Sequence, residues 1–163
     1  MDDTEALRTE FLMLLTNGPE KISGIVAPLR PEELKNQWKP GEWSVVEVLA
    51  HLRSCADVWE GCMRRIQAED HPRIKAVNPK LYIRSVNYES LEFAESFAAF
   101  KAQRERLLAW LQSLPTEDWL RGATVYGAGK PLARTLLFYA GWLARHERTH
   151  YRQFTKIVRK LKG

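Results

Sequence analysis

The stretch Gly141–Phe154, GWLARHERTHYRQF, decides which fold the chain can adopt. It lies within a longer helical pattern, which we expect to run from about Pro131 to Lys162, with proline where a first turn accepts it. At about 100° per residue, His146 and His150 lie roughly 40° apart in the middle of the apolar stripe. A helix with such a stripe buries it against other helices, so the pattern predicts a bundle.

Three further segments show the same periodicity. The first is expected from about Thr4 to Leu29, with an interruption at Asn17–Pro19, because Gly and Pro are poor in a helix interior. The second runs from Ser44 to about Glu69, and Ser44 opens an S-x-x-E capping box at its start. The third runs from about Ser90 to Ser113. Four long helices predict an all-α four-helix bundle that occupies residues 1–163 as one domain.

The connections between these helices differ in length. The longest, Asp70–Tyr88, separates the second and third helices, and connections of that length often carry function. A second connection, RGATVYGAGK at Arg121–Lys130, precedes the last helix. Within it ATVY is expected to form one short extended piece, and almost nothing else indicates a strand.

Composition sets limits on location and partners. No apolar run approaches the roughly 20 residues that span a bilayer, and the start MDDTEALR is acidic, so we expect a cytoplasmic protein. Cys55 and Cys62 lie about 10 Å apart along one helix, too far to bond to each other, and are expected to be reduced. The net charge is +5, but basic residues are interleaved with acidic ones and only the tail KIVRKLKG is locally basic. Nucleic-acid binding is therefore not expected.

The segment His146–His150 also matches H-E-x-x-H, the signature of zinc metalloproteases. Those enzymes take a third ligand downstream, whereas the residues that follow His150 contain no His, Asp, Glu or Cys. A third ligand must therefore come from upstream, and His51, at the edge of the apolar stripe of its helix, is the best candidate. His71, beside Pro72 in the long connection, is expected at the surface.

Several alternatives remain open for these residues. The paired histidines can be core residues bonded to neighbours such as Gln153, although their spacing favours a metal. Cys55, one turn after His51, can be a fourth ligand, but a small buried core thiol is the favoured interpretation. Glu147 can act as a base beside a metal or be a solvated charge at the rim, and we favour the rim. Trp43 and Trp142 can line a pocket mouth, but packing in the core is commoner.

Three segments together resemble the DinB-like family of metal-binding bundles. They are KPGEWSVVEVLAHLRSCADVWEGCMRRI at Lys39–Ile66, LPTEDW at Leu114–Trp119 and HERTHYRQF at His146–Phe154. The resemblance covers most of the chain and implies an up-down-down-up helix order, together with a homodimer. It also implies a divalent metal, zinc or nickel, held at the positions of His51, His146 and His150.

The resemblance also implies a theme of thiol transfer, since some relatives conjugate or isomerise with small thiols. We therefore expect a metal-dependent transferase that joins a low-molecular-weight thiol to an electrophile, with Asp70–Tyr88 selecting the substrate. One alternative is a metal-dependent hydrolase with Glu147 as base. Another is a non-enzymatic, metal-stabilised binding protein, which a sealed site with Cys55 as fourth ligand would favour.

Overall fold

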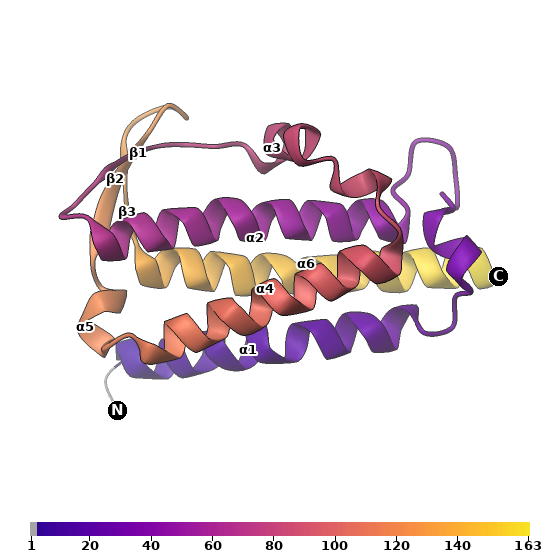
Figure 1. Ribbon diagram of the computed structural model, residues 1–163, viewed down its shortest axis with the longest axis horizontal. Helices are drawn as coiled ribbons and strands as arrows, with labels where there is room; N and C mark the ends of the chain where they lie inside the picture. The colour runs from indigo at the N-terminus through magenta and orange to yellow at the C-terminus, as the bar shows by residue number, and fades with distance from the viewer. Residues whose placement is uncertain (1–2) are drawn as a thin grey trace.

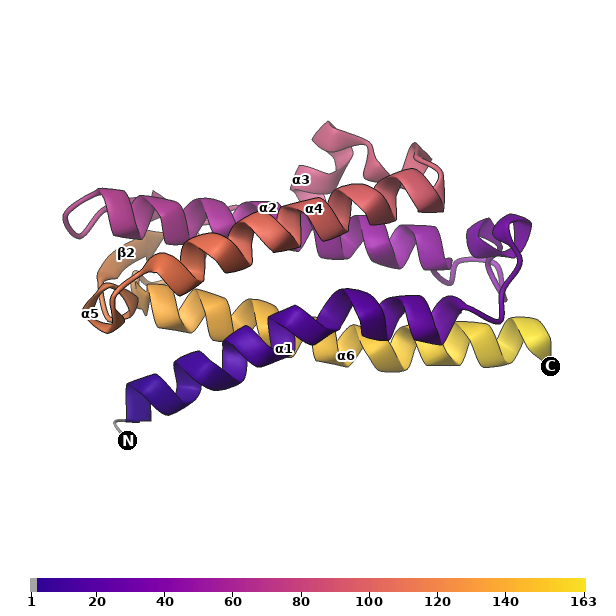
Figure 2. The ribbon, with the colours of Figure 1, turned by 60° about the horizontal axis from the view of Figure 1, so that its bottom comes forward.

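Four long helices make up the body of the protein, whose computed structural model describes residues 3–163. They are α1 (Asp3–Val26), α2 (Val45–Ala68), α4 (Phe93–Ser113) and α6 (Leu136–Lys162). In Figure 1, α1 and α6 run in one direction and α2 and α4 in the other. The up-down-down-up four-helix bundle is thus confirmed, and Figure 2 shows the same helices from a second side.

Helix α1 runs without a break through Asn17–Pro19, so the predicted interruption is wrong. Gly18 is buried, and a Cβ atom there would lie 3.0 Å from the Tyr151 hydroxyl and 3.2 Å from Arg104 Nη1. The glycine therefore marks a close approach between helices and not a helix end. The helix ends at Val26 and is followed by a short 3₁₀ helix, η1 (Pro31–Lys35).

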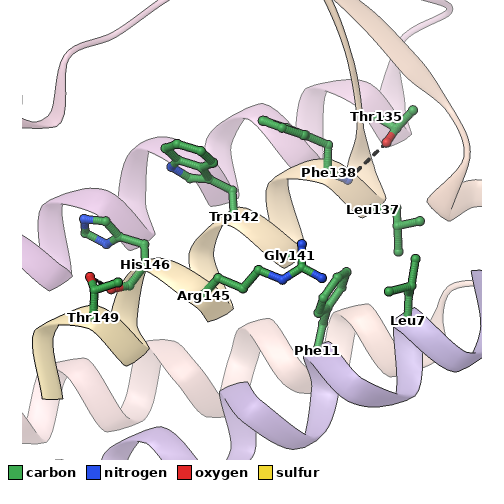
Figure 3. Close-up of a pocket in the computed structure, with 10 residues that line it drawn as sticks. All are labelled: Leu7, Phe11, Thr135, Leu137, Phe138, Gly141, Trp142, Arg145, His146 and Thr149. Atoms are coloured by element: carbon green, nitrogen blue, oxygen red, sulfur yellow. Dashed lines mark hydrogen bonds between the residues drawn. The ribbon is translucent and has the colours of Figure 1, made fainter. Parts of the chain in front are cut away.

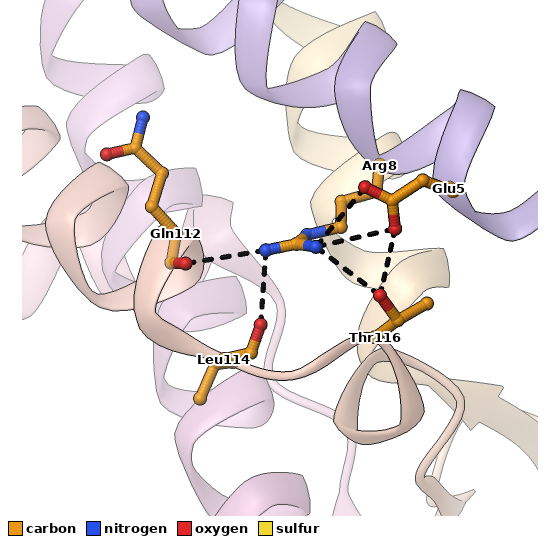
Figure 4. Close-up of polar contacts among 5 residues, drawn as sticks. All are labelled: Glu5, Arg8, Gln112, Leu114 and Thr116. Atoms are coloured by element: carbon orange, nitrogen blue, oxygen red, sulfur yellow. Dashed lines mark hydrogen bonds and ion pairs between the residues drawn. The ribbon is translucent and has the colours of Figure 1, made fainter.

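The start of α1 is tied to the turn that follows α4 (Figure 4). Arg8 Nη2 donates a hydrogen bond of 3.1 Å to the carbonyl oxygen of Leu114. The Thr116 hydroxyl donates a bond of 2.8 Å to Glu5. Thr116 opens the short helix α5 (Thr116–Trp119), so these contacts hold one end of the bundle together.

The connection between α2 and α4 is long because both helices run in the same direction. The chain must return along the 24 residues of α2, a distance of about 36 Å. It does so through β1 (Arg73–Lys75), α3 (Pro79–Val86) and η2 (Tyr88–Ser90), which the sequence pattern did not predict. We call residues 69–92 the crossover.

A three-stranded sheet closes one end of the molecule. Strand β2 (Gly122–Tyr126) pairs in parallel with β1 and antiparallel with β3 (Leu132–Thr135). The extended piece expected at ATVY is confirmed within β2, but the rest of the sheet was missed. Helix α6 begins at Leu136 and not at Pro131, because residues 132–135 pair with β2. The Thr135 side chain then caps the helix by accepting a bond from the Phe138 amide.

The apolar core consists of two clusters along the bundle axis. One contains Leu15, Leu107 and Leu143, and the other contains Ile22, Phe100 and Phe154. Between them along the helices lie polar side chains, which we call the polar layer: His51, Arg104, His146, Glu147 and His150. No helix in residues 3–163 has the length and apolar character needed to cross a membrane.

Candidate metal centre

Three histidine rings from two helices meet in the polar layer. His51 Nε2 on α2 lies 3.2 Å from His146 Nε2 on α6, and His150 Nε2 lies 3.1 Å from the same atom. The ring centroids of His51 and His150 are 4.9 Å apart. Nitrogens bound to one tetrahedral zinc ion at 2.0–2.1 Å are about 3.3–3.4 Å apart, so this spacing fits a shared divalent metal.

The local hydrogen bonds leave ring nitrogens available to a metal. His150 Nδ1 donates to Gln153 Oε1 at 2.7 Å, which places the lone pair of His150 on Nε2, facing the other rings. Burial, with a smaller contribution from neighbouring groups such as His150, lowers the pKa of His51 and of His146 to about 4. Both rings are therefore neutral near pH 7, as metal ligands must be.

Cys55 lies beside these rings, as the predicted core thiol. It is buried, and its Sγ is 3.6 Å from His51 Nε2. Its donor atom and those of His51 and His146 all lie within 4.8 Å of one another, a set that leaves His150 out. Burial raises the pKa of the Cys55 thiol to about 12, so a metal would have to displace the thiol proton, whereas His150 already presents an oriented lone pair. We therefore favour His150 over Cys55 as a ligand.

Glu147 is not the solvated rim charge that the sequence favoured. Its side chain is 1% exposed, and both carboxylate oxygens accept hydrogen bonds from the buried guanidinium of Arg104 on α4. Arg104 Nη1 also donates to the carbonyl oxygen of Leu15 on α1, at 2.9 Å. With both oxygens occupied, Glu147 has little capacity to act as a base, and it instead joins three helices beside the histidines.

The burial of Glu147 follows from the way α6 packs in the bundle. Its buried face includes Ala140, Gly141 and Ala144, small residues that contribute little to an apolar stripe in sequence. They let α1 approach closely and shift the buried face toward Glu147. His146 and His150 consequently lie half-buried at the edge of that face and not in its middle.

The cluster opens to solvent through a cavity of about 350 Å³, which we call the mouth. His51 and His150 line it together with Trp43, Glu42 and Lys80. Glu42 and Lys80 were not singled out from the sequence. Glu42 precedes the capping box of α2, and Lys80 comes from α3 in the crossover, so only the fold brings them to the histidines.

The structure also places three other residues that the sequence singled out, His71, Trp43 and Trp142. His71 is exposed at the surface, as predicted, and its Nε2 lies 3.1 Å from the Thr124 hydroxyl of β2. Trp43 lines the mouth, and Trp142 is 50% exposed, so the preference for core packing was wrong for Trp142.

Comparisons with known proteins identify two similar proteins. A protein of Geobacillus thermodenitrificans (strain NG80-2), named "Putative metal-dependent hydrolase", is 26% identical over 159 residues, which cover 94% of this chain and 85% of the relative. The solved structure of YfiT from Bacillus subtilis, described as "a probable metal-dependent hydrolase with an unusual four-helix bundle topology", has a TM-score of 0.79 at 20% identity. That match covers 95% of this chain and 87% of YfiT and shows a shared fold.

The family model of the DinB superfamily matches residues 14–154. That range contains α2, α4, the crossover and all three histidines of the cluster. Because the match spans most of the 163 residues, the chain belongs to the DinB superfamily.

Proposed function

We propose that His51, His146 and His150 hold one divalent metal ion, zinc or nickel, and that the protein is a metal-dependent hydrolase. One observation carries the proposal: His146 Nε2 lies 3.2 Å from His51 Nε2 and 3.1 Å from His150 Nε2, beside an open mouth. The names of the two similar proteins support it, since both are described as metal-dependent hydrolases.

The residues around the mouth then take distinct roles. A bound divalent metal would supply Lewis acidity that makes water nucleophilic near neutral pH. Glu42, the carboxylate that lines the mouth with the histidines, accepts the proton of the attacking water. Lys80 binds an anionic group of the substrate, and Trp43 packs against its apolar part. Gln153 keeps His150 in the ligating tautomer.

Transfer of a small thiol to an electrophile is the second candidate. It is favoured because the site offers little help in removing a proton from water. Glu147 is paired with Arg104, and Glu42 is only half-buried. A thiol near a metal ionises more readily than water and needs less help from a base. A non-enzymatic role is less well supported, since the mouth leaves the cluster open to a substrate.

Metal content tests the first part of the proposal. We expect one ion per chain in the wild type and in Cys55→Ser, and loss of the ion in His51→Ala, His146→Ala and His150→Ala. His71→Ala is the matched control, because this histidine lies at the surface beside Thr124. Retention of a full equivalent of metal by His146→Ala, measured by elemental analysis after dialysis, would exclude the proposed ligand set.

Activity assays separate hydrolysis from transfer. A panel of esters and amides is incubated with the metal-loaded protein, with and without a small thiol. For hydrolysis, turnover needs no thiol, and Glu42→Gln lowers kcat by roughly 10²–10⁴-fold without loss of metal. Turnover that depends on added thiol and survives in Glu42→Gln would support the transferase instead.

A further inference from the structure

A groove of about 700 Å³ lies between the first half of α1 and the first half of α6 (Figure 3). Apolar side chains form most of its wall: Leu7, Phe11, Leu137, Phe138 and Trp142. Trp142 is 50% exposed and Phe138 36% exposed, which is unusual for large apolar side chains of a helix that packs in a bundle. Neither residue has a role in the proposed metal chemistry.

The groove follows from the way the two helices diverge. A Cβ atom on Gly141 would lie 2.6 Å from Phe11 Cζ, so the helices are in close contact there. Toward the N-terminus of the chain, α1 turns away from α6 in both ribbon views (Figures 1 and 2). The Phe11–Gly141 contact therefore forms the floor of a preformed apolar groove.

One end of this groove is cationic. Arg145 and Thr149 line both the groove and an adjoining cavity of about 670 Å³, whose wall also includes Arg148, Arg152 and Lys156. No carboxylate lines that second cavity. Within residues 3–163, no carboxylate lies within ion-pair distance of Arg145, Arg148 or Arg152.

The positive charge at this end is not balanced from within α6. Glu147 is the sole acidic residue of α6, and it is buried against Arg104. Arg145 lies over the Phe11 ring, with its guanidinium carbon 4.9 Å from the ring centroid, and so stands where the apolar wall meets the cationic end. A ligand here would meet apolar surface along its length and free guanidinium groups at one terminus.

We propose that this groove binds a small amphiphilic anion, a long-chain carboxylate, with its chain along Phe11, Phe138 and Trp142 and its head group on Arg145. The groove volume falls in the range of about 300–1,000 Å³ that is typical of small-molecule sites. Guanidinium groups bind carboxylates through paired, charge-assisted hydrogen bonds. The groove adjoins the proposed metal centre, because His146 contributes to one of its walls, but the proposed head-group position on Arg145 involves none of the three histidines.

The test uses the full chain without metal, titrated with laurate below the concentration at which micelles form. Binding is followed by calorimetry and by tryptophan fluorescence, with Trp142→Phe to assign the signal. One laurate binds per chain, and dodecyltrimethylammonium, which has the same chain length and the opposite charge, binds at least roughly tenfold more weakly. Metal-loaded protein binds laurate equally well, so failure of the metal proposal leaves this result unaffected.

Matched variants locate the site. Arg145→Gln weakens laurate binding by roughly tenfold, whereas Arg106→Gln, an exposed arginine on α4, does not. Phe138→Glu weakens binding by at least as much, whereas Leu120→Glu, at an apolar residue that is 53% exposed outside the groove, does not. If circular dichroism shows that Phe138→Glu misfolds, Thr149→Glu at the exposed groove rim replaces it.

Several results would overturn the proposal. Equal affinity for laurate and dodecyltrimethylammonium would show that the cationic end plays no part. Sedimentation showing a dimer that Phe138→Glu dissociates, with no laurate binding, would assign the groove to a second copy of the chain. Binding to phosphatidylglycerol vesicles without binding of monomeric laurate would assign it to a membrane surface.

Discussion

Gly18 lies where α1 packs against the polar layer. A Cβ atom there would lie 3.2 Å from Arg104 Nη1 and 3.3 Å from Glu147 Oε2, and both atoms are held in a buried ion pair that cannot easily move. The glycine thus has a steric purpose, although it lies in the interior of a helix, where Gly is intrinsically unfavourable. Gly24, on the same helix, has no such neighbours within 4 Å.

This contrast gives a paired prediction. Gly18→Ala lowers the free energy of unfolding by about 1–2 kcal/mol, because crowding against the ion pair outweighs the gain in helix propensity of about 1 kcal/mol. Gly24→Ala raises the free energy of unfolding by up to about 1 kcal/mol. Urea denaturation of both variants measures the difference. An unchanged or increased stability of Gly18→Ala would show that the side chains of the polar layer can shift to make room for a methyl group.

The ion pair itself is expected to be sensitive to the loss of one partner. Arg104→Met or Glu147→Gln alone lowers the free energy of unfolding by about 3–5 kcal/mol, since each leaves a buried group without its partner. The second single variant, Glu147→Leu, loses a similar amount, and the double variant Arg104→Met with Glu147→Leu loses much less than the sum of Arg104→Met and Glu147→Leu. Denaturant titrations in a double-mutant cycle provide the measurement, with exposed Arg106→Met as control. Additive losses would mean that the two side chains are not coupled.

At the scale of elements, one carboxylate holds the α3 and η2 part of the crossover against the bundle. Asp57 on α2 accepts hydrogen bonds from the hydroxyl of Tyr88, at 2.6 Å, and of Tyr82, at 3.3 Å. Gln103 on α4 donates a third bond to it, at 2.7 Å. The same crossover carries Lys80 to the mouth, so Asp57 supports the position of a proposed substrate-binding residue.

Removal of this carboxylate is expected to loosen the crossover locally. In Asp57→Ala, amide hydrogens of α3 exchange at least roughly tenfold faster, because bonds to a charged group of about 1.5–3 kcal/mol each are lost. Amides in the buried part of α2 keep their protection. Glu60→Ala, which breaks only an exposed pair with Arg64, is the control. Mass spectrometry measures the exchange. Equal rates of hydrogen exchange in α3 of both variants would show that Asp57 does not hold α3.

At the scale of the whole molecule, the polar layer divides the apolar core into two parts. Apolar clusters lie on both sides of the histidines, and each contains side chains from several helices. We therefore expect the bundle to fold before any metal binds, in contrast to a zinc finger.

Metal removal should accordingly change stability but not fold. After chelation, far-ultraviolet circular dichroism at 25 °C keeps its helical signal. Free metal at a hundredfold excess over Kd adds about 2.7 kcal/mol to the free energy of unfolding, and this raises the midpoint of thermal unfolding by roughly 5–10 °C. His51→Ala serves as the control and shows no such rise. Loss of the helical signal on chelation would mean that the metal is needed for folding.

The four helices, the Ser44 cap and the His146–His150 pair could all be predicted from the chain alone, because they are encoded at short range. Apolar spacing of three and four residues specifies each helix, and the same spacing places His146 and His150 side by side. The cap needs only Ser44 and Glu47, which bond to each other's backbone as expected. His51 was chosen because no ligand type follows His150 and because it lies at the edge of the apolar stripe of its helix, whereas helix order came from the resemblance to known bundles.

The surroundings of the histidines depend on residues distant in sequence, and the pattern along one helix cannot reveal them. Glu147 meets Arg104 across 43 residues, and Arg104 meets Leu15 across 89, so burial of the pair follows from the packing of three helices. The sheet likewise includes a long-range pair, because β1 reaches β2 from a distant part of the chain, with Arg73 opposite Thr124, whereas β2 and β3 form a hairpin. Local periodicity sets which residues share a face, whereas the neighbours that each face meets are set when the helices pack.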